Sequence, residues 1–449
     1  MRFDRGTIVL DGLPRSEPAI PDAIWDERSG LWRAPAFRHD RLVATLRERG
    51  HTLDSALESN LRMETGPWQR PELRPYQEEA IQSWNAFGRK GVVVLPTGAG
   101  KTRVAIAAAA SVRASCLVLC PTRALMAQWQ RELGRWYGGP IGMIGDGEND
   151  LQKVTIITFE SAWRHLDRVG DRFELVVVDE AHHFQGGSRS EALEMLPASM
   201  RLGLSATPPD PGTPGAERLA DLLGPTVCEL GVCDLVGTYL ADYDRVYLGV
   251  KLTDEEREEY ETEYANFSVM RRAWLRANPD ADWATFMRAM ARIPDGRKAI
   301  DGYQRAVKIA SLPQAKRALT TRLLSRHADT KTLVFTALAD HAYDISLDNL
   351  IPVITAEIGR AERAEILSKF GQGKVRAVVS ARVLNEGIDV PDASVAIVVA
   401  GALGKREYIQ RIGRVLRPRP GKRAIIYELA TTGTLDDERA RARRRRFAA

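Results

Sequence analysis

The chain has 449 residues, of which 44% are hydrophobic and 27% are charged, and these proportions are ordinary for a water-soluble globular protein. At this length we expect about three domains. No uninterrupted apolar run approaches the ~20 residues of a membrane helix, and the opening Met1–Arg5 shows no signal peptide. The net charge of +5 fits an anionic partner, and it fits a basic enzyme without a polymer partner equally well.

The cysteines are too few for a disulfide framework in a chain of this length, and they lack the spacing of a zinc site. We therefore expect Cys116, Cys120, Cys228 and Cys233 to be reduced and structural. Reduced thiols, with no signal peptide or membrane helix, predict an intracellular, cytoplasmic protein, associated with the nucleoid if prokaryotic.

Residues 1–66 are predicted to form a small α+β domain. Gly6–Leu10 has the pattern of a strand, and Ile24–Trp32 that of a hairpin turning at Ser29-Gly30. Arg38–Arg49 predicts a helix that ends at Gly50.

Residues 67–236 alternate short apolar runs with segments of helical length. The runs are Val92–Leu95, Leu117–Leu119, Val154–Ile157, Leu175–Val178 and Leu202–Leu204. Continuous apolar strands alternating with helices predict a parallel sheet that is covered on both faces.

A phosphate-binding loop follows the first of these strands. Leu95–Thr102 reads LPTGAGKT and precedes an alanine-rich helix, Arg103–Ala110. The residues expected to bind ATP are Pro96, Thr97, Gly98, Ala99, Gly100, Lys101 and Thr102. The glycines let backbone N–H groups face phosphate, the lysine reaches the outer phosphates, and the threonine ligates Mg²⁺. The strict pattern has glycine where Leu95 stands, and the alternative is a tight turn carrying a surface lysine.

An acidic pair follows the strand Leu175–Val178. Asp179 emerges at the carboxyl edge of the sheet, where ligands bind in such folds. We expect it to hold Mg²⁺, and we expect Glu180 to orient or deprotonate the attacking water. The alternative is a solvated pair that caps the next helix.

A second α/β domain is predicted over 237–449, interrupted by a helical insertion at about 253–310. Thr253–Glu256 is a capping box, and Trp283, Phe286, Met287 and Met290 form one apolar helix face, interpreted as core rather than as a base-stacking surface. The later apolar runs are Leu333–Phe335, Val353–Ile354, Val375–Val379, Val395–Val399 and Ile425–Tyr427.

Arginines dominate two segments near the carboxyl end. Arg411, Arg414 and Arg417 recur at helical spacing. They form either a basic surface or, for Arg414 and Arg417, a pair that neutralises charge on the γ-phosphate. Arg439–Arg446 predicts a solvated, partly disordered tail.

Together the phosphate loop, the acidic pair and the arginines describe an ATPase whose site closes between two lobes. The set resembles a superfamily-two helicase of the DEAH type over nearly the whole chain, which implies two RecA-like domains in tandem. The resemblance assigns ATP contacts to Arg74, Gln77, Gly387, Asp389 and Gln410. It assigns coupling of hydrolysis to movement to His182, Ser205 and Thr207, and nucleic-acid contacts to Arg123, Thr158, Ser161 and Thr336.

Several details resemble one branch, the XPB family of DNA repair helicases. They are Arg74–Gln77, Asp179–His183 and QRIGRVLRP at Gln410–Pro418. Trp25–Arg28 and Trp32–Ala36 resemble the damage-recognition domain of archaeal-type members, and the insertion lies where that family carries its thumb. The resemblance implies a DNA-dependent ATPase that moves 3′→5′ on single-stranded or junction-containing DNA in repair, with a nuclease as a further expected partner.

One departure from this family concerns strand separation. The family's Arg-Glu-Asp triplet, linked to unwinding, is replaced here by Pro208–Gly212, so translocation or remodelling without unwinding stays open. Other open alternatives are the motor subunit of a restriction or phage-defence nuclease complex, an RNA helicase, and a DNA-binding scaffold that uses ATP only as a structural ligand.

Overall fold

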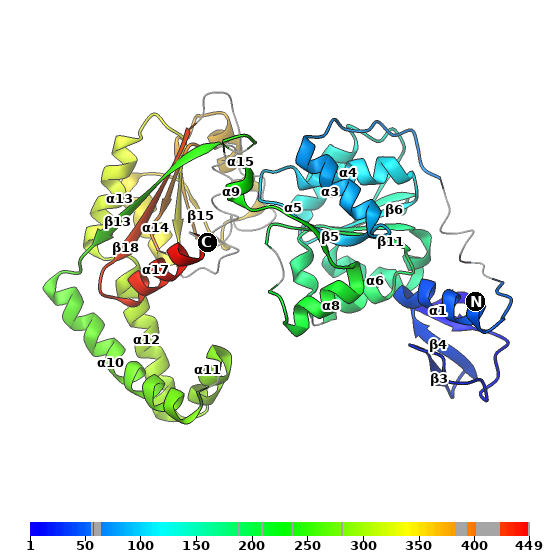
Figure 1. Ribbon diagram of the computed structural model, residues 1–449. Helices are drawn as coiled ribbons and strands as arrows, with labels where there is room; N and C mark the ends of the chain where they lie inside the picture. The colour runs from blue at the N-terminus through cyan, green and yellow to red at the C-terminus, as the bar shows by residue number, and fades with distance from the viewer. Residues whose placement is uncertain are drawn as a thin grey trace. The chain divides into compact units, whose positions relative to one another are not determined.

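The computed structural model describes residues 1–54, 57, 64–186, 188–207, 210–235, 237–239, 241–279, 282–381, 393–400 and 423–447. These residues form two compact units, Met1–Leu235 and the part of the chain from 237 onward (Figure 1). Each unit contains a largely parallel sheet with helices packed on it, so the predicted α/β class is confirmed. Within the described ranges, no helix combines the length and the apolarity that a bilayer crossing requires.

The amino-terminal part is a small antiparallel sheet followed by a helix. Its elements are β1 (Arg2–Asp4), β2 (Thr7–Leu10), β3 (Ile24–Asp26), β4 (Leu31–Pro35), η1 (Ala36–Arg38) and α1 (His39–Glu48), with strand order β1-β2-β4-β3. The predicted hairpin is confirmed, because β3 and β4 pair antiparallel with Trp25 opposite Trp32. Helix α1 ends just before Gly50, whose φ of +83° is a conformation that suits glycine after a helix.

Ion pairs connect this small sheet to the rest of the first unit. Arg38 Nη1 lies 2.7 Å from Asp221 Oδ1 on α8 (Pro214–Leu223), and Lys90 Nζ lies 2.9 Å from Asp40 Oδ2. Phe37 is partly buried and packs against the core of the large sheet. The amino-terminal sheet and the first α/β body therefore share contacts within one unit.

The first α/β body has a sheet ordered β12-β5-β11-β10-β6-β9-β7-β8 among the described strands. Its strands are β5 (Lys90–Val94), β6 (Cys116–Cys120), β7 (Ile141–Gly145), β8 (Glu148–Asn149), β9 (Val154–Thr158), β10 (Leu175–Val178), β11 (Met200–Ser205) and β12 (Thr226–Glu229). Its helices are α3 (Pro75–Ala86), α4 (Lys101–Val112), α5 (Arg123–Leu133), α6 (Phe159–Val169), α7 (Ser188–Glu194), α8 and α9 (Val232–Leu235), with short turns η2 (Gly170–Arg172) and η3 (Ala181–Phe184). Every neighbouring pair is parallel except β7 with β8.

The second unit has a parallel sheet ordered β13-β18-β17-β14-β16-β15. Its strands are β13 (Asp242–Val250), β14 (Thr332–Thr336), β15 (Val353–Ile354), β16 (Ala377–Ala381), β17 (Val395–Val398) and β18 (Arg423–Thr431). Its packed helices are α13 (Gln314–Arg326), α14 (Ala339–Asn349), α15 (Arg360–Gly371) and α17 (Leu435–Phe447). The strand predicted at Val375–Val379 begins two residues later, at Ala377.

The helical insertion consists of α10 (Asp254–Ala277), α11 (Trp283–Ala291) and α12 (Pro294–Ser311). Figure 1 shows α10 and α12 extending side by side from the second sheet. The capping box is confirmed, since Glu256 N–H donates to Thr253 Oγ1 at 3.2 Å and Thr253 N–H to Glu256 Oε2 at 3.0 Å. Phe286 and Met290 are buried against Phe267, and Met287 packs beside them partly buried. Trp283 is 45% exposed, so the core interpretation is wrong for this member of the stripe.

The predicted tail is wrong in one respect, because Arg439–Arg446 belongs to helix α17. The acidic residues Asp436 and Asp437 stand in its first turn, where a helix favours negative charge, and Ala440 is fully buried. Cys116, Cys120 and Cys228 are free thiols as expected, and the Cys233 side chain lies outside the described part.

Candidate ATP site

The phosphate loop lies between the carboxyl end of β5 and the start of α4. Gly98 and Gly100 have φ of +88° and +80°, which turns the backbone in a way that residues with a Cβ rarely adopt. Leu95 N–H donates to Ser205 O at 3.0 Å, so the loop begins fixed to the end of β11. The loop thus leads into the amino terminus of a helix, where N–H groups and the helix dipole favour phosphate.

The two side chains expected to reach phosphate and metal stand in the first turn of α4. Lys101 and Thr102 are both half-buried. Lys101 Nζ donates to Leu95 O at 3.1 Å, so the ammonium group reaches back to the first residue of the loop. A lysine held over a glycine-rich loop supplies a point charge for phosphate oxygens.

Residues that precede the loop in the chain form hydrogen bonds to its backbone. Tyr76 Oη and Gln77 Nε2 both donate to Ala99 O, at 2.7 and 2.8 Å. Gln77 Oε1 also accepts from Arg74 N–H at 2.9 Å. A Cβ on Gly100 would lie 2.5 Å from Gln77 Nε2, so a larger residue there would have to displace the end of the Gln77 side chain. The ATP contacts predicted for Arg74 and Gln77 stay predictions, and the structure adds a supporting role for Gln77 and for Tyr76.

Asp179 follows β10 and is buried at the same edge of the sheet. Its Oδ2 accepts from Trp129 Nε1 at 2.9 Å, and its Oδ1 accepts from Glu180 N–H at 3.0 Å. Burial raises the pKa of Asp179, while the Trp129 bond and the positive charge of Lys101 act to lower that pKa. A hydroxyl on Thr102 and a carboxylate on Asp179 are hard oxygen donors, which suits Mg²⁺.

Glu180 adopts a left-handed backbone conformation with φ of +50°. For a residue with a Cβ this conformation costs roughly 1–2 kcal/mol, and such costs are commonly found at functional sites. Its Oε2 lies 3.4 Å from His182 Nδ1. Glu180 therefore connects the predicted metal-binding residue to the residues predicted to couple hydrolysis to movement.

The three predicted coupling residues lie together. His182 Nδ1 is 3.4 Å from Ser205 Oγ. That hydroxyl donates to Thr207 O at 2.7 Å and accepts from Thr207 N–H at 3.2 Å. All three side chains are buried, so Glu180, His182, Ser205 and Thr207 form one connected group.

The predicted nucleic-acid contacts lie at the carboxyl ends of β6, β9 and β14. Arg123 opens α5 and pairs with Asp146. Thr158 Oγ1 accepts from Ser161 N–H, and thereby caps α6, and it donates to Ser161 Oγ at 3.0 Å. Thr336 is fully buried and donates to Leu338 O at 3.0 Å. Arg123 is the member of this group whose side chain is substantially exposed.

Several predicted residues lie outside the described part of the chain. They are Gly387, Asp389, Gln410, Arg414 and Arg417, together with Pro208 at the departure from the family pattern. Their roles stay predictions. Trp129 is a site residue that the sequence analysis missed, because its partner Asp179 lies 50 positions away.

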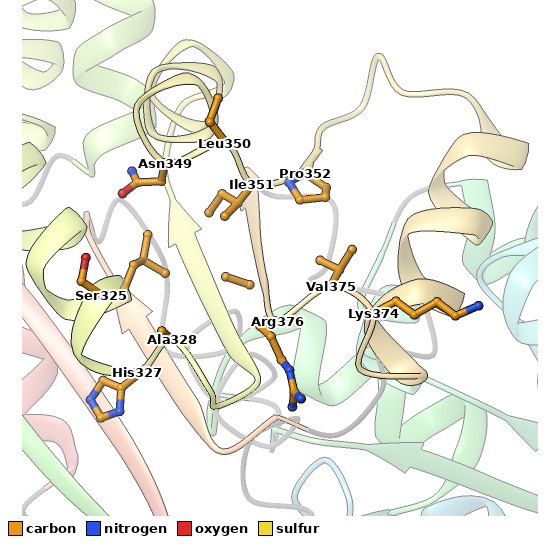
Figure 2. A pocket seen from close by; sticks show the side chains of 12 residues that line it. Ser325, His327, Ala328, Asn349, Leu350, Ile351, Pro352, Lys374, Val375 and Arg376 are labelled. Atoms are coloured by element: carbon orange, nitrogen blue, oxygen red, sulfur yellow. The ribbon is translucent and has the colours of Figure 1, made fainter.

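The second unit contains a cavity of about 390 Å³ (Figure 2). It lies where β16 begins, between the ends of α13 and α14. Its lining consists of Leu324, Ser325, His327, Ala328, Asn349, Leu350, Ile351, Pro352, Lys374, Val375, Arg376 and Ala377. Nucleotides bind at the carboxyl ends of parallel strands, so this cavity at an amino end is not where we expect a nucleotide.

Family models match three parts of the chain. Residues 1–54 match the Xeroderma pigmentosum group B helicase damage recognition domain. Residues 70–210 match the type III restriction enzyme res subunit, and residues 315–419 match the helicase conserved C-terminal domain.

Curated relatives extend the similarity to the full length. The chain is 34% identical to the DNA 3′-5′ translocase XPB2 of Sulfurisphaera tokodaii, over 99% of this chain and 99% of that protein. It is 32% identical to the DNA 3′-5′ helicase XPB of Mycobacterium tuberculosis, over 84% of this chain and 64% of the relative. It is 31% identical to the putative DNA 3′-5′ helicase Rad25 of Halobacterium salinarum, over 83% of this chain and 56% of the relative.

Among solved structures, the Hef helicase domain of Pyrococcus furiosus is similar with a TM-score of 0.55. The similarity covers 83% of this chain and 98% of that domain at 17% identity, so it bears on the fold alone. The fold is that of two RecA-like domains, as the sequence predicted.

Proposed function

Because the chain belongs to the XPB-type DNA 3′-5′ helicases and translocases, we propose that it is an ATP-driven motor that moves 3′→5′ along DNA in DNA repair. The observation that carries the proposal is the gathering of the phosphate loop, Asp179 and Glu180 at one sheet edge, in a chain whose residues 1–54 match a damage-recognition domain. The proposal gives damage recognition to residues 1–66, ATP binding to 67–236 and the second motor domain to 237–449.

The proposed chemistry is hydrolysis of the γ-phosphate of ATP. Lys101 and the loop N–H groups hold the phosphates, while Thr102 and Asp179 hold Mg²⁺, which when bound neutralises charge on phosphate oxygens. Glu180 orients the attacking water and takes its proton. Arg414 and Arg417 of the second domain complete the site when the two domains close on ATP.

Movement requires that ATP favour one arrangement of the two domains. A ligand shifts a conformational equilibrium only through different affinities for the two states. ATP held by both domains stabilises the closed arrangement, and hydrolysis removes that preference. The connected residues Glu180, His182, Ser205 and Thr207 carry the change from the site to the sheet.

The decisive test is ATP turnover in Lys101→Ala with single-stranded DNA and RNA of matched sequence. We expect turnover to be lost because the lysine supplies the positive charge for the phosphates. We expect folding to survive because Lys101 is half-buried and its ammonium group donates to one backbone oxygen. Lys153→Ala is the matched control, since Lys153 Nζ also donates to a backbone oxygen, Glu64 O at 3.2 Å, at the opposite edge of the sheet. Near-normal hydrolysis in Lys101→Ala would refute the proposed ATP site. Stronger stimulation by RNA than by DNA would favour an RNA helicase.

Direction and strand separation need separate assays. Displacement of streptavidin from one DNA end or the other reports 3′→5′ movement without unwinding. A gel assay with a junction-containing duplex reports strand separation. Because the Arg-Glu-Asp triplet of the family is absent, we expect translocation to persist where unwinding is weak.

A second candidate is the motor subunit of a restriction or phage-defence complex. The match of residues 70–210 to a restriction res subunit favours it, whereas the match of residues 1–54 favours repair. A nuclease partner would fit both and discriminates neither. Stimulation of ATP turnover by damaged over undamaged DNA would support repair, and equal turnover on both would support the restriction alternative.

A further inference from the structure

Asp179 is held by an indole rather than by solvent or backbone alone. Trp129 is 1% exposed, and its Nε1 donates to Asp179 Oδ2 at 2.9 Å. With Glu180 N–H bonded to Oδ1, both oxygens of the carboxylate are fixed from the protein side. The rotation of this carboxylate therefore depends on Glu180 N–H and on α5, the helix that carries Trp129.

A buried indole N–H needs some acceptor, and a backbone carbonyl is sufficient. Trp84 shows this in the same unit, since it is also 1% exposed and its Nε1 donates to Arg201 O at 2.9 Å. Burial alone therefore explains why Trp129 has a partner. It does not explain why that partner is the carboxylate expected to hold the metal.

Helix α5 also carries the exposed arginine that is expected to contact DNA. Arg123 is its first residue, and Thr122 caps it by accepting from Leu125 N–H. The helix is anchored to the first α/β body by Met126, Trp129 and Leu133, which are all buried. Arg123 and Trp129 are six positions apart, about 9 Å along one rigid helix. A shift of α5 at its first turn is thus passed to the Asp179 carboxylate through one hydrogen bond.

We propose that Trp129 is a positioning residue that couples strand contact at the amino end of α5 to the orientation of Asp179, and so to the binding of the metal–nucleotide complex. This rests on the proposed function. A DNA phosphate that draws Arg123 from Asp146 changes the position of α5, and the indole turns the carboxylate with it. Coupling of this kind is reciprocal, so the metal–nucleotide complex must also strengthen DNA binding by the same factor.

The test compares Trp129→Phe with Trp84→Phe in the full chain. Both changes remove a buried indole N–H and leave an aromatic ring. The readout is binding of a non-hydrolysable ATP analogue, measured with Mg²⁺, with Mn²⁺ and without metal, each with and without single-stranded DNA. In Trp129→Phe we expect metal-dependent nucleotide affinity to fall about 10- to 100-fold, the range found when a residue supporting a metal ligand is lost. We expect metal-free nucleotide binding to remain, and the increase in affinity caused by DNA to disappear. Trp84→Phe is expected to retain both.

A second measurement uses the unaltered protein and does not depend on how the variants fold. The indole N–H resonance of Trp129, followed by NMR, is expected to shift on adding single-stranded DNA and again on adding the metal–nucleotide complex, while that of Trp84 stays in place. Equal behaviour of the two variants, or a Trp129 resonance that neither ligand moves, overturns the inference. If the unaltered protein shows no effect of DNA on nucleotide binding or turnover, the proposed function fails instead.

Discussion

The buried ion pair between Lys316 and Asp436 gives the sharpest prediction about stability. Lys316 is fully buried, and its Nζ lies 2.6 Å from Asp436 Oδ2 and 2.6 Å from Val399 O. Asp436 Oδ2 also accepts from Thr431 N–H at 3.0 Å. The pair therefore joins α13 to the ends of β17 and β18 in the second unit.

We expect Lys316→Met to lower the free energy of unfolding of this region by about 3–5 kcal/mol, because it leaves a buried carboxylate without its counter-charge. The methionine keeps most of the apolar stem, so lost volume adds little. The double variant with Asp436→Asn removes both charges, and its cost is expected to be smaller than the sum of the two single changes by roughly 0.5–3 kcal/mol.

The matched control is the next residue on the same helix. Arg317 pairs with Asp348 at the surface, with 44% of the arginine side chain exposed. Arg317→Met is therefore expected to cost about 0–1 kcal/mol. Hydrogen exchange of peptides covering β17 and β18 measures the local free energy of opening and avoids treating a chain of two units as one transition. A cost for Lys316→Met equal to that of Arg317→Met, or strict additivity in the double variant, would refute the reasoning.

Three further predictions concern single positions. Gly100→Ala must displace Gln77 as well as adopt a positive φ, whereas Gly88→Ala meets open space at φ of +67°. The positive φ costs roughly 1–2 kcal/mol at either position. We therefore expect Gly100→Ala to weaken ATP binding and to lower the melting temperature more than Gly88→Ala does, and we expect Gly88→Ala to leave ATP binding unchanged. Burial lowers the pKa of His341 from 6.5 to about 4, so the unfolded chain binds the proton more readily; stability is expected to fall as pH drops from about 6.5, by about 3 kcal/mol at pH 4, and His341→Gln should lack this component in pH-dependent unfolding. Burial raises the pKa of Cys116 to about 12, so alkylation of this thiol at pH 8 should require unfolding, and rapid labelling of the native protein would contradict its placement.

Burial explains which strands the sequence could predict. The strand β6, CLVLC, is buried at every position, and a continuous apolar run of this kind indicates a central parallel strand. The strand β13, DYDRVYLGV, has no fully buried residue, because it lies at the edge of the sheet and β18 is its one partner among the described strands. Because β13 contains charged residues, it has no continuous apolar run by which the sequence would indicate a strand. One of them, Asp244, pairs with Arg423 on the neighbouring strand β18.

The site divides in a similar way. The residues at the phosphate loop and the acidic pair follow short local patterns, so the sequence predicted them directly. The contacts of Trp129 with Asp179 and of Gln77 with Ala99 join positions 50 and 22 residues apart, and no local pattern specifies such pairs. They depend on which strands become neighbours, and this is a property of the folded sheet.

The order of strands gives a structural basis for the coupling role that the family resemblance predicts for Ser205. Strand β11 lies between β5, which leads into the phosphate loop, and β10, which leads into Asp179. At the end of β11, Ser205 O accepts from Leu95 N–H, and Ser205 Oγ lies beside His182 Nδ1. A movement of either the loop or the acidic segment must therefore strain or release a bond to Ser205. Since Ser205 Oγ also bonds Thr207, a change at the loop or at the acidic segment reaches Thr207 through Ser205, which supports the predicted coupling role of both residues.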